Sequence, residues 1–315
     1  MSDDKPNISV VGAGLIGRAW AIVFARAGHP VSLYDANRNA LRRSVGALET
    51  ALSDLEAAGL LKELPATVGA RIAPVYALKD AVASAAYVQE NISENLAAKR
   101  TLFAELDRLA PANAILASST STIPAGQWSA ELAGRARCLV AHPVNPPHLV
   151  PLVELSPAPW TSPDVVAGAR ALHESVGQVP IVVTKEIQGF ILNRLQGALL
   201  AEAVRLFADG YASIDDIDKT VRDGLGLRWS FMGPFETIDL NAPGGVAVYC
   251  ERYGDLYHEM AKTQTPRQWD EVLVRSIEAE RRALLDKGEL EERALWRDRR
   301  LMQLIAHKRK AAAQD

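Results

Sequence analysis

The chain has 315 residues, of which 48% are hydrophobic and 23% charged, and its formal net charge is -3. This composition is typical of a globular protein with enough apolar material for one large domain or two ordinary ones. The slight acidity argues against nucleic acid or an anionic membrane as partner, and two cysteines outside any Cys-x-x-Cys pair give little support for a disulfide framework or a metal site.

The first residues, MSDDKPNISVVGAG, lack the basic start, apolar core and cleavage site of a secretion signal. No apolar run reaches the roughly 18 residues that cross a bilayer. We therefore expect a cytoplasmic protein with no membrane partner.

Short apolar runs alternate with helical patterns in the first part of the chain. They predict strands at 8–11, 30–34, 71–73, 86–89, 115–118, 137–141, 152–155 and 181–184, and helices at 15–27, from 41 onward, at 94–109 and at 164–176. This alternation is typical of a sheet covered on both faces and parallel in at least its first part. After Thr184 only helices are predicted, at 190–209, 213–222, 268–286 and 289–310. We therefore expect an α/β domain over residues 1–187 and an all-α domain over 188–315.

The glycine loop GAGLIG places Gly12, Gly14 and Gly17 between the first strand and the first helix. In a dinucleotide-binding loop the first glycine permits a tight turn, the second lets the backbone approach a pyrophosphate, and the third lets the helix pack on the strand. The free N–H groups of the helix start favour that phosphate. Asp35 ends the second strand and suits the hydroxyls of an unphosphorylated ribose, with Arg38 as the one nearby basic group that would favour NADP. We predict a Rossmann-type domain that binds NAD.

The proline-rich segment AHPVNPPHLVPLVEL, residues 141–155, contains His142 and Glu154. Oxidation of an alcohol by a nicotinamide needs a base near neutral pH, which histidine supplies, and a carboxylate on the far imidazole nitrogen fixes its tautomer. His142 ends one predicted strand and Glu154 lies on the next, so a hairpin-like pairing brings them together. We predict a catalytic pair, the alternative being a core histidine beside a salt-bridged glutamate. His148 is a further candidate to face the substrate.

Several segments, in this order, resemble the L-3-hydroxyacyl-CoA dehydrogenase superfamily, and within it the lambda-crystallin / L-gulonate 3-dehydrogenase branch: VVGAGLIGRAW, LYD, SSTST, AHPVNPP, PLVEL, KEIQGFILNRLQ, GLGLRWSFMGPFET and LNAPGG. The resemblance covers nearly the whole chain and implies a homodimer formed through the helical domain. It assigns the His–Glu pair to His142 and Glu154, and adds Ser121 and Asn193 as groups that orient the substrate oxygen. The implied NAD contacts are Gly12, Gly14, Leu15, Ile16, Gly17, Asp35, Glu94, Lys99, Ser121 and Asn145.

Substrates in this superfamily include acyl-CoA thioesters and small free hydroxy acids. The acyl-CoA members present lysines to CoA phosphates from the helical hairpin after the second strand, whereas residues 47–70 here contain four carboxylates and only Lys62, with Arg42 and Arg43 just upstream. Ser119 also stands where acyl-CoA members commonly have asparagine. We therefore expect an NAD-dependent L-gulonate-type 3-dehydrogenase that oxidises the 3-hydroxyl of a small hydroxy acid.

Arg228 and Arg194 are the candidates to bind the substrate carboxylate. The alternatives are a 3-hydroxyacyl-CoA (3-hydroxybutyryl-CoA) dehydrogenase, and an L-carnitine 3-dehydrogenase whose quaternary ammonium would meet Trp229 and Phe231. A crystallin-like NAD-binding structural protein is the non-enzymatic alternative. A lysine-based dehydrogenase is disfavoured because Lys185 precedes its glycine instead of lying within a glycine-rich helix.

Overall fold

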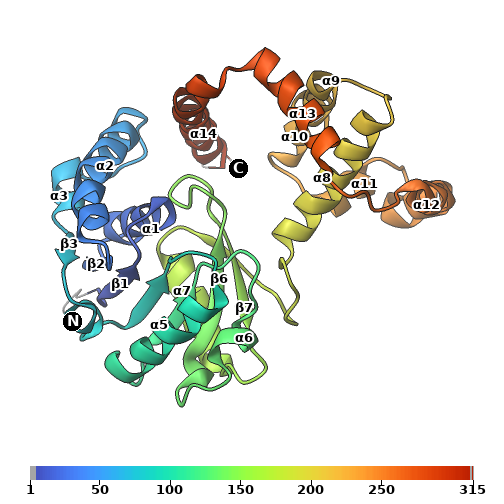
Figure 1. The fold of residues 1–315 in the computed structure, drawn as a ribbon. Helices are drawn as coiled ribbons and strands as arrows, with labels where there is room; N and C mark the ends of the chain where they lie inside the picture. The colour runs from blue at the N-terminus through green and yellow to red at the C-terminus, as the bar shows by residue number, and fades with distance from the viewer. Residues whose placement is uncertain (1–4, 313, 315) are drawn as a thin grey trace. The chain divides into compact units, whose positions relative to one another are not determined.

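The computed structural model describes residues 5–312 and 314, which form two compact units (Figure 1). The first unit contains the chain up to Asn193 together with the residues from Arg293 onward, and the second is Arg194–Glu292. Within the described residues, no helix is both long and apolar enough to span a membrane.

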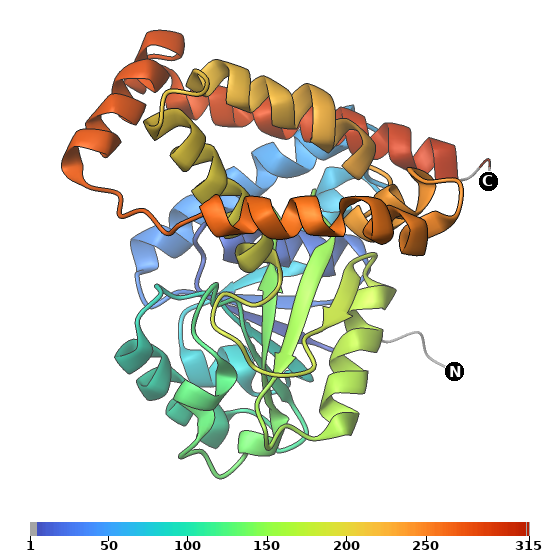
Figure 2. The same ribbon diagram turned by 90° about the vertical axis from the view of Figure 1, so that its right-hand side faces the viewer.

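The first unit is built on an eight-stranded sheet in the order β3-β2-β1-β4-β5-β6-β7-β8. The strands are β1 Ile8–Val11, β2 Val31–Tyr34, β3 Ile72–Val75, β4 Tyr87–Glu90, β5 Ile115–Ser118, β6 Cys138–Pro143, β7 Leu152–Pro157 and β8 Val179–Val182. All neighbours pair in parallel except β6 and β7, which are antiparallel. In Figure 2 the green strands run steeply across the blue ones, as the cumulative twist of a large sheet requires. The order of the first six strands is that of a dinucleotide-binding fold, so the predicted fold class is confirmed.

Helices cover both faces of this sheet. They are α1 Leu15–Arg26, α2 Arg38–Ala57, α3 Pro65–Gly69, α4 Leu78–Val82, α5 Leu96–Leu109, α6 Ala125–Ser129, the 3₁₀ turn η1 Arg135–Arg137, and α7 Pro163–Ser175. Consecutive strand residues point to opposite faces: Val10 joins the core that contains α1, whereas Val11 joins the core that contains α5. Strands buried on both sides explain why they appear in the sequence as continuous apolar runs.

The last helix, α14 (Leu290–Ala312), differs from its expected grouping. From the sequence we expect it in the helical domain over 188–315, but from Arg293 onward it belongs to the first unit. Met302 is buried in the core that contains α1, and Leu301 and Ile305 pack against that core. The polar pattern of this helix does not reveal which partner it packs on, because only a narrow apolar stripe is covered.

The second unit is helical. Its elements are α8 Leu192–Ala208, which begins in the first unit, α9 Ile214–Lys219, the π-helical turn η2 Thr220–Leu225, α10 Gly226–Trp229, α11 Pro234–Leu240, α12 Gly245–Thr263, α13 Glu271–Leu284 and the turn η3 Lys287–Glu289. Helix α12 was not predicted from the sequence; none of its residues is buried, and it exposes several large apolar side chains, including Val246, Leu256 and Met260. Among the described residues of this unit, only Val204, Thr237 and Ala242 are buried.

Candidate active site

The glycine loop joins β1 to α1 and leaves an open space over one of its glycines. Gly12 has φ +98°, and a Cβ there would lie 2.8 Å from the carbonyl oxygen of Asn91; a Cβ on Gly17 would overlap the carbonyl of Gly12. A Cβ on Gly14, by contrast, would meet nothing within 4 Å. Gly14 is the N-cap of α1, and no side chain caps that helix. The first and third glycines are thus required by packing, whereas the open second glycine and the uncapped amides fit a pyrophosphate.

Asp35 lies next to this loop, at the end of β2. Its Oδ2 accepts a hydrogen bond from the Ala13 amide at 2.8 Å, and its Oδ1 accepts one from the Asn37 amide at 2.8 Å. These two bonds hold the half-buried carboxylate beside the glycine loop. Leu15 is 69% exposed at the start of α1 and Ile16 is half-buried. The arrangement fits the adenosine half of NAD, with the carboxylate available to ribose hydroxyls.

His142 and Glu154 face each other across the antiparallel pair β6–β7. The register pairs the two residues directly, and His142 Nδ1 lies 2.8 Å from Glu154 Oε2. Both side chains are buried, at 5% and 0% exposure. The hairpin-like pairing predicted from the sequence is therefore confirmed. A carboxylate accepts and does not donate, so the proton of the neutral imidazole sits on Nδ1 and the lone pair on Nε2, as a general base requires.

The other oxygen of Glu154 is held by the chain that follows β8. Its Oε1 accepts hydrogen bonds of 2.8 Å from the amides of Ile191 and Leu192, where α8 begins. Gly189 at φ +77° and Phe190 at φ +49° both take left-handed backbone conformations that turn these amides toward the carboxylate. The fully buried Phe190 ring lies 5.5 Å from the His142 ring. Sequence reasoning missed this support; the only signal was a glycine directly before a predicted helix.

Ser121 and Asn193 are also brought together. The Asn193 side-chain amide donates to the Ser121 carbonyl oxygen at 2.9 Å, which ties the loop after β5 to the start of α8. The Ser121 amide donates to Glu94 Oε1 at 3.1 Å. Ser121 is exposed and Asn193 is half-buried, so both side chains are accessible.

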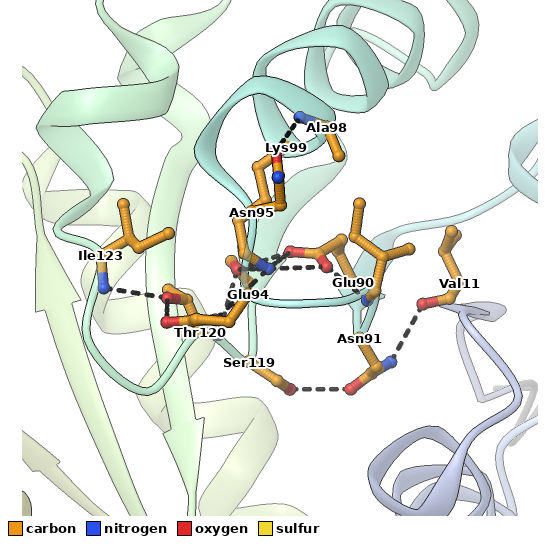
Figure 3. A network of polar contacts seen from close by, with 12 residues as sticks. Val11, Glu90, Asn91, Glu94, Asn95, Ala98, Lys99, Ser119, Thr120 and Ile123 are labelled. Carbon is orange, nitrogen blue, oxygen red and sulfur yellow. Dashed lines mark hydrogen bonds and ion pairs between the residues drawn. The ribbon is translucent and has the colours of Figure 1, made fainter.

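Glu94 and Lys99 differ in burial, since the Glu94 side chain is partly exposed and the Lys99 side chain is buried. The Glu94 side chain is 40% exposed. Its Oε1 holds the loop after β5 by accepting from the Thr120 hydroxyl at 2.5 Å (Figure 3) and from the Thr122 amide at 2.9 Å. Lys99 is 1% exposed, and its ammonium bonds to the buried Glu90. The resemblance implied that Lys99 contacts NAD, but its charged end does not reach the surface here because Glu90 holds it inside.

The remaining candidates differ in their exposure to solvent. Asn145 is exposed in the loop between β6 and β7, and Arg194 and Arg228 are exposed in the second unit. Burial, with a contribution from Arg26, lowers the pKa of His148 to about 4, so this imidazole is neutral at physiological pH. Its carbonyl accepts a hydrogen bond from Arg26, at the end of α1 remote from the glycine loop. No cluster of potential metal ligands is present in the described part of the chain.

Comparison with known proteins matches both parts of the chain. The model of the 3-hydroxyacyl-CoA dehydrogenase NAD binding domain covers residues 7–187, and that of the 3-hydroxyacyl-CoA dehydrogenase C-terminal domain covers 189–283. A lambda-crystallin homolog of Bos taurus is 44% identical over 95% of this chain and 94% of its own length. An L-carnitine dehydrogenase of Streptomyces griseus subsp. griseus is 38% identical over 80% of this chain and 75% of its own.

Among solved structures, an NAD+-dependent dismutase is similar to this chain over almost its full length. This protein, 5-formyl-3-hydroxy-2-methylpyridine 4-carboxylic acid 5-dehydrogenase, superposes with a TM-score of 0.80 at 30% identity, covering 96% of this chain and 97% of its own. The agreement in fold extends over both units of the sequence.

Proposed function

Given that this chain belongs to the 3-hydroxyacyl-CoA dehydrogenase family and is an NAD-dependent dehydrogenase acting on a CH–OH group, we propose that it oxidises the 3-hydroxyl of a small free hydroxy acid to the 3-keto acid. L-gulonate is the type of substrate we favour. The observation that carries the proposal is the buried His142–Glu154 pair, whose Nδ1–Oε2 distance is 2.8 Å. When bound, NAD supplies the acceptor for the hydride that leaves the hydroxyl carbon.

The roles of the side chains follow from their contacts. His142 takes the hydroxyl proton on Nε2, and Glu154 stabilises the imidazolium that forms while its second oxygen stays bonded to the Ile191 and Leu192 amides. Ser121 and Asn193, which are linked to each other, orient the reacting oxygen. An imidazole lone pair can accept the hydroxyl proton as the hydride leaves, which suits oxidation of the alcohol.

The charge of residues 47–70, the part of the α2–α3 hairpin beyond the first turns of α2, supports a small acid over a CoA thioester. Glu49, Asp54 and Glu56 carry negative charge there, while Glu63 forms a bidentate pair with Arg71 at 2.6 and 2.9 Å and is neutralised. Residues 47–70 therefore hold three further carboxylates against Lys62, which disfavours a CoA polyphosphate at that part of the hairpin. Arg38, Arg42 and Arg43 on the first turns of α2 offset this charge, and at physiological salt its effect reaches only about 8 Å. We propose that Arg228 or Arg194, both exposed, binds the carboxylate of the substrate.

A carnitine-type substrate is the second candidate. Trp229 is 40% exposed and Phe231 is 69% exposed, so two aromatic faces are available to a quaternary ammonium. The similarity to an L-carnitine dehydrogenase gives this candidate a specific basis. A 3-hydroxyacyl-CoA substrate and a crystallin-like structural role remain as outcomes of the test.

We further propose that the protein works in the cytoplasm as a homodimer formed through its second unit. That unit leaves large apolar side chains exposed, including Phe235 at 80%, Val272 at 71% and Leu227 at 67%. Isolated exposed apolar residues are normal, but so many on a unit with so little core are typical of a surface that another chain covers.

The test is NADH formation by the purified protein with L-gulonate, L-carnitine, 3-hydroxybutyrate and 3-hydroxybutyryl-CoA. We expect turnover of a free acid, little turnover of the thioester, and loss of turnover by at least about 10²-fold in His142→Ala because the base is removed. NADH binding by His142→Ala, measured by fluorescence, should stay near the wild-type value. Preference for the thioester would refute the charge argument, and equal loss of NADH binding would contradict His142 as the base. Binding of NADH without turnover of any substrate would favour the structural role.

A further inference from the structure

A buried ionic cluster lies at the carboxyl ends of β4 and β5, directly beneath the loop that carries Ser121. Glu90 is 0% exposed and Lys99 is 1% exposed. Lys99 Nζ lies 2.9 Å from each carboxylate oxygen of Glu90, and Glu90 also accepts from the Ser118 hydroxyl and the Ile92 amide, both at 2.5 Å. In a sheet of this kind the ligand binds at the carboxyl ends of the strands, so the cluster is next to the cofactor site and not at a random place in the core.

Stability alone does not explain this ion pair. Removing two charges from water costs several kcal/mol per ion, and buried pairs are often replaced by apolar residues of similar volume without loss. Burial raises the pKa of the Glu90 carboxyl, while Lys99 and the hydrogen bonds act in the opposite direction. The cluster therefore stabilises the fold little, which points to a role in holding what it contacts.

The contacts of Lys99 lead outward to the cofactor loop. Its Nζ lies 3.9 Å from Glu94 Oε2, so one ammonium is shared by a buried carboxylate and a partly exposed one. The other oxygen of Glu94, Oε1, accepts a hydrogen bond from Thr120 (Figure 3) and further hydrogen bonds from Ser121 and Thr122. The Lys99 ammonium thus restrains the Glu94 carboxylate, and this carboxylate in turn restrains the backbone at Ser121.

Asn91, the residue after Glu90, bonds to both the loop that follows β5 and the end of β1. The Asn91 Oδ1 accepts from the Ser119 hydroxyl at 2.7 Å, and the Asn91 amide group donates to the Val11 carbonyl at 3.3 Å (Figure 3). The carbonyl of Asn91 is also the group that a side chain on Gly12 would strike. Two consecutive residues at the end of β4 therefore connect the glycine loop to the loop that carries Ser121.

We propose that Glu90 is a positioning residue: through Lys99 it holds Glu94 and Ser121 in the geometry that binds the nicotinamide half of NAD. This inference rests on the proposed function for its catalytic consequence, but not for its effect on cofactor binding. Lys99 then acts as the buried link between Glu90 and Glu94. The influence of Glu90 extends to the cofactor site through consecutive contacts, from Glu90 to Lys99, then to Glu94 and then to Ser121.

The experiment compares Glu90→Gln with the double variant Glu90→Gln/Lys99→Met. Glutamine keeps one acceptor oxygen for the Ile92 amide, and its NH2 group can donate to the Ser118 oxygen. The double variant also removes the ammonium that has lost its buried partner, so it should recover the urea midpoint lost in the single variant. We expect the NADH dissociation constant to rise about tenfold or more in both variants, because a displaced loop is costly even far from the chemistry. The KM for NAD should rise more than kcat falls.

The buried pair Arg137–Asp107 is the matched control. It joins at 2.9 Å in the same unit and contacts backbone carbonyls away from the glycine loop. Asp107→Asn should lower the urea midpoint and leave NADH affinity unchanged. A double variant that binds NADH as tightly as wild type would overturn the inference, since the pair would then be only structural. Failure of wild type to oxidise any substrate would refute the proposed function while leaving the NADH comparison decisive for Glu90.

Discussion

The surroundings of a single side chain set the charge it can carry, and His173 on α7 shows this most clearly. The imidazole is 0% exposed, and its ring centre lies 5.2 Å from that of Trp20. Tyr87 donates its hydroxyl proton to Gln89, so His173 Nε2, at 2.9 Å, must donate to the Tyr87 oxygen. Its Nδ1 is buried and has no hydrogen-bond partner. Burial lowers the pKa of His173 to about 3, and the side chain is neutral throughout the physiological range.

We expect His173→Gln to make the protein less sensitive to acid. Because the pKa of His173 is lower in the folded chain than the ordinary value near 6.5, the unfolded chain binds a proton first as pH falls. The free energy of unfolding therefore decreases from about pH 6.5 downward until the folded pKa is reached, by up to about 1.4 kcal/mol per pH unit. Urea midpoints between pH 7.5 and 4.5 measure the slope, which should be shallower in the variant. His258→Gln, on exposed α12, is the control, and parallel slopes for His173→Gln and wild type would rule out this account.

At the scale of the elements, the glycines in the turn from β1 into α1 have different roles. Two are required by packing, and one leaves space that a ligand can fill. Gly17 lies against the Gly12 carbonyl and Gly12 against Asn91, whereas the space around Gly14 is open. The antiparallel pair β6–β7 acts similarly for catalysis, since its register alone places His142 opposite Glu154. In both cases backbone geometry decides which side chains meet.

We expect Gly17→Ala and Gly14→Ala to differ in their effects on thermal stability and on NADH affinity. Gly17→Ala should lower both the melting temperature and NADH affinity, because its methyl group overlaps backbone that cannot rotate away. Gly14→Ala should keep the melting temperature and still lose NADH affinity about tenfold or more, because its methyl group fills the space proposed for the pyrophosphate. Gly46→Ala on α2, which is equally open, is the control for an alanine away from the cofactor. Unchanged NADH affinity in Gly14→Ala would place the phosphates elsewhere.

At the scale of the whole molecule, the two units differ in how their apolar residues are used. The first unit buries its large side chains in two cores, one on each face of the sheet. The second unit exposes Phe231 at 69% and Leu240 at 67%, besides the residues named above. Burial of apolar surface is favourable by about 25 cal/mol per Å² before the cost of association is subtracted, so covering these side chains with a second copy would favour a dimer.

We expect the protein to elute with a mass twice the 34.1 kDa of one chain in size-exclusion chromatography with light scattering. Phe235→Glu or Val272→Glu should shift the population toward monomer, because a charge is costly in a covered apolar surface. Leu64→Glu, which is 68% exposed in the first unit, should leave the dimer intact. A wild-type monomer at micromolar concentration would contradict the proposed dimer.

The sequence by itself determined the family, the fold class, the NAD cofactor and the type of reaction. The family follows from segments that resemble it, whereas the fold class, the cofactor and the reaction type depend on local patterns. These are apolar runs that become strands, a glycine spacing that a tight turn requires, and a histidine and a glutamate on consecutive strands. Even the meeting of His142 and Glu154 followed from short-range geometry, since only a short loop separates β6 from β7. These features can be predicted from the sequence because the role of each residue depends on its near neighbours in the chain.

Only the tertiary structure decided which residues support that chemistry from a distance. The amides of Ile191 and Leu192 reach Glu154 across 37 and 38 positions of the chain. The burial of Lys99 against Glu90, and the packing of Met302 on the first unit, likewise depend on residues brought together by the sheet and its helices. Burial and long-range contact are properties of the folded chain, because the same lysine or methionine is written identically in the sequence whether it lies in the core or in water.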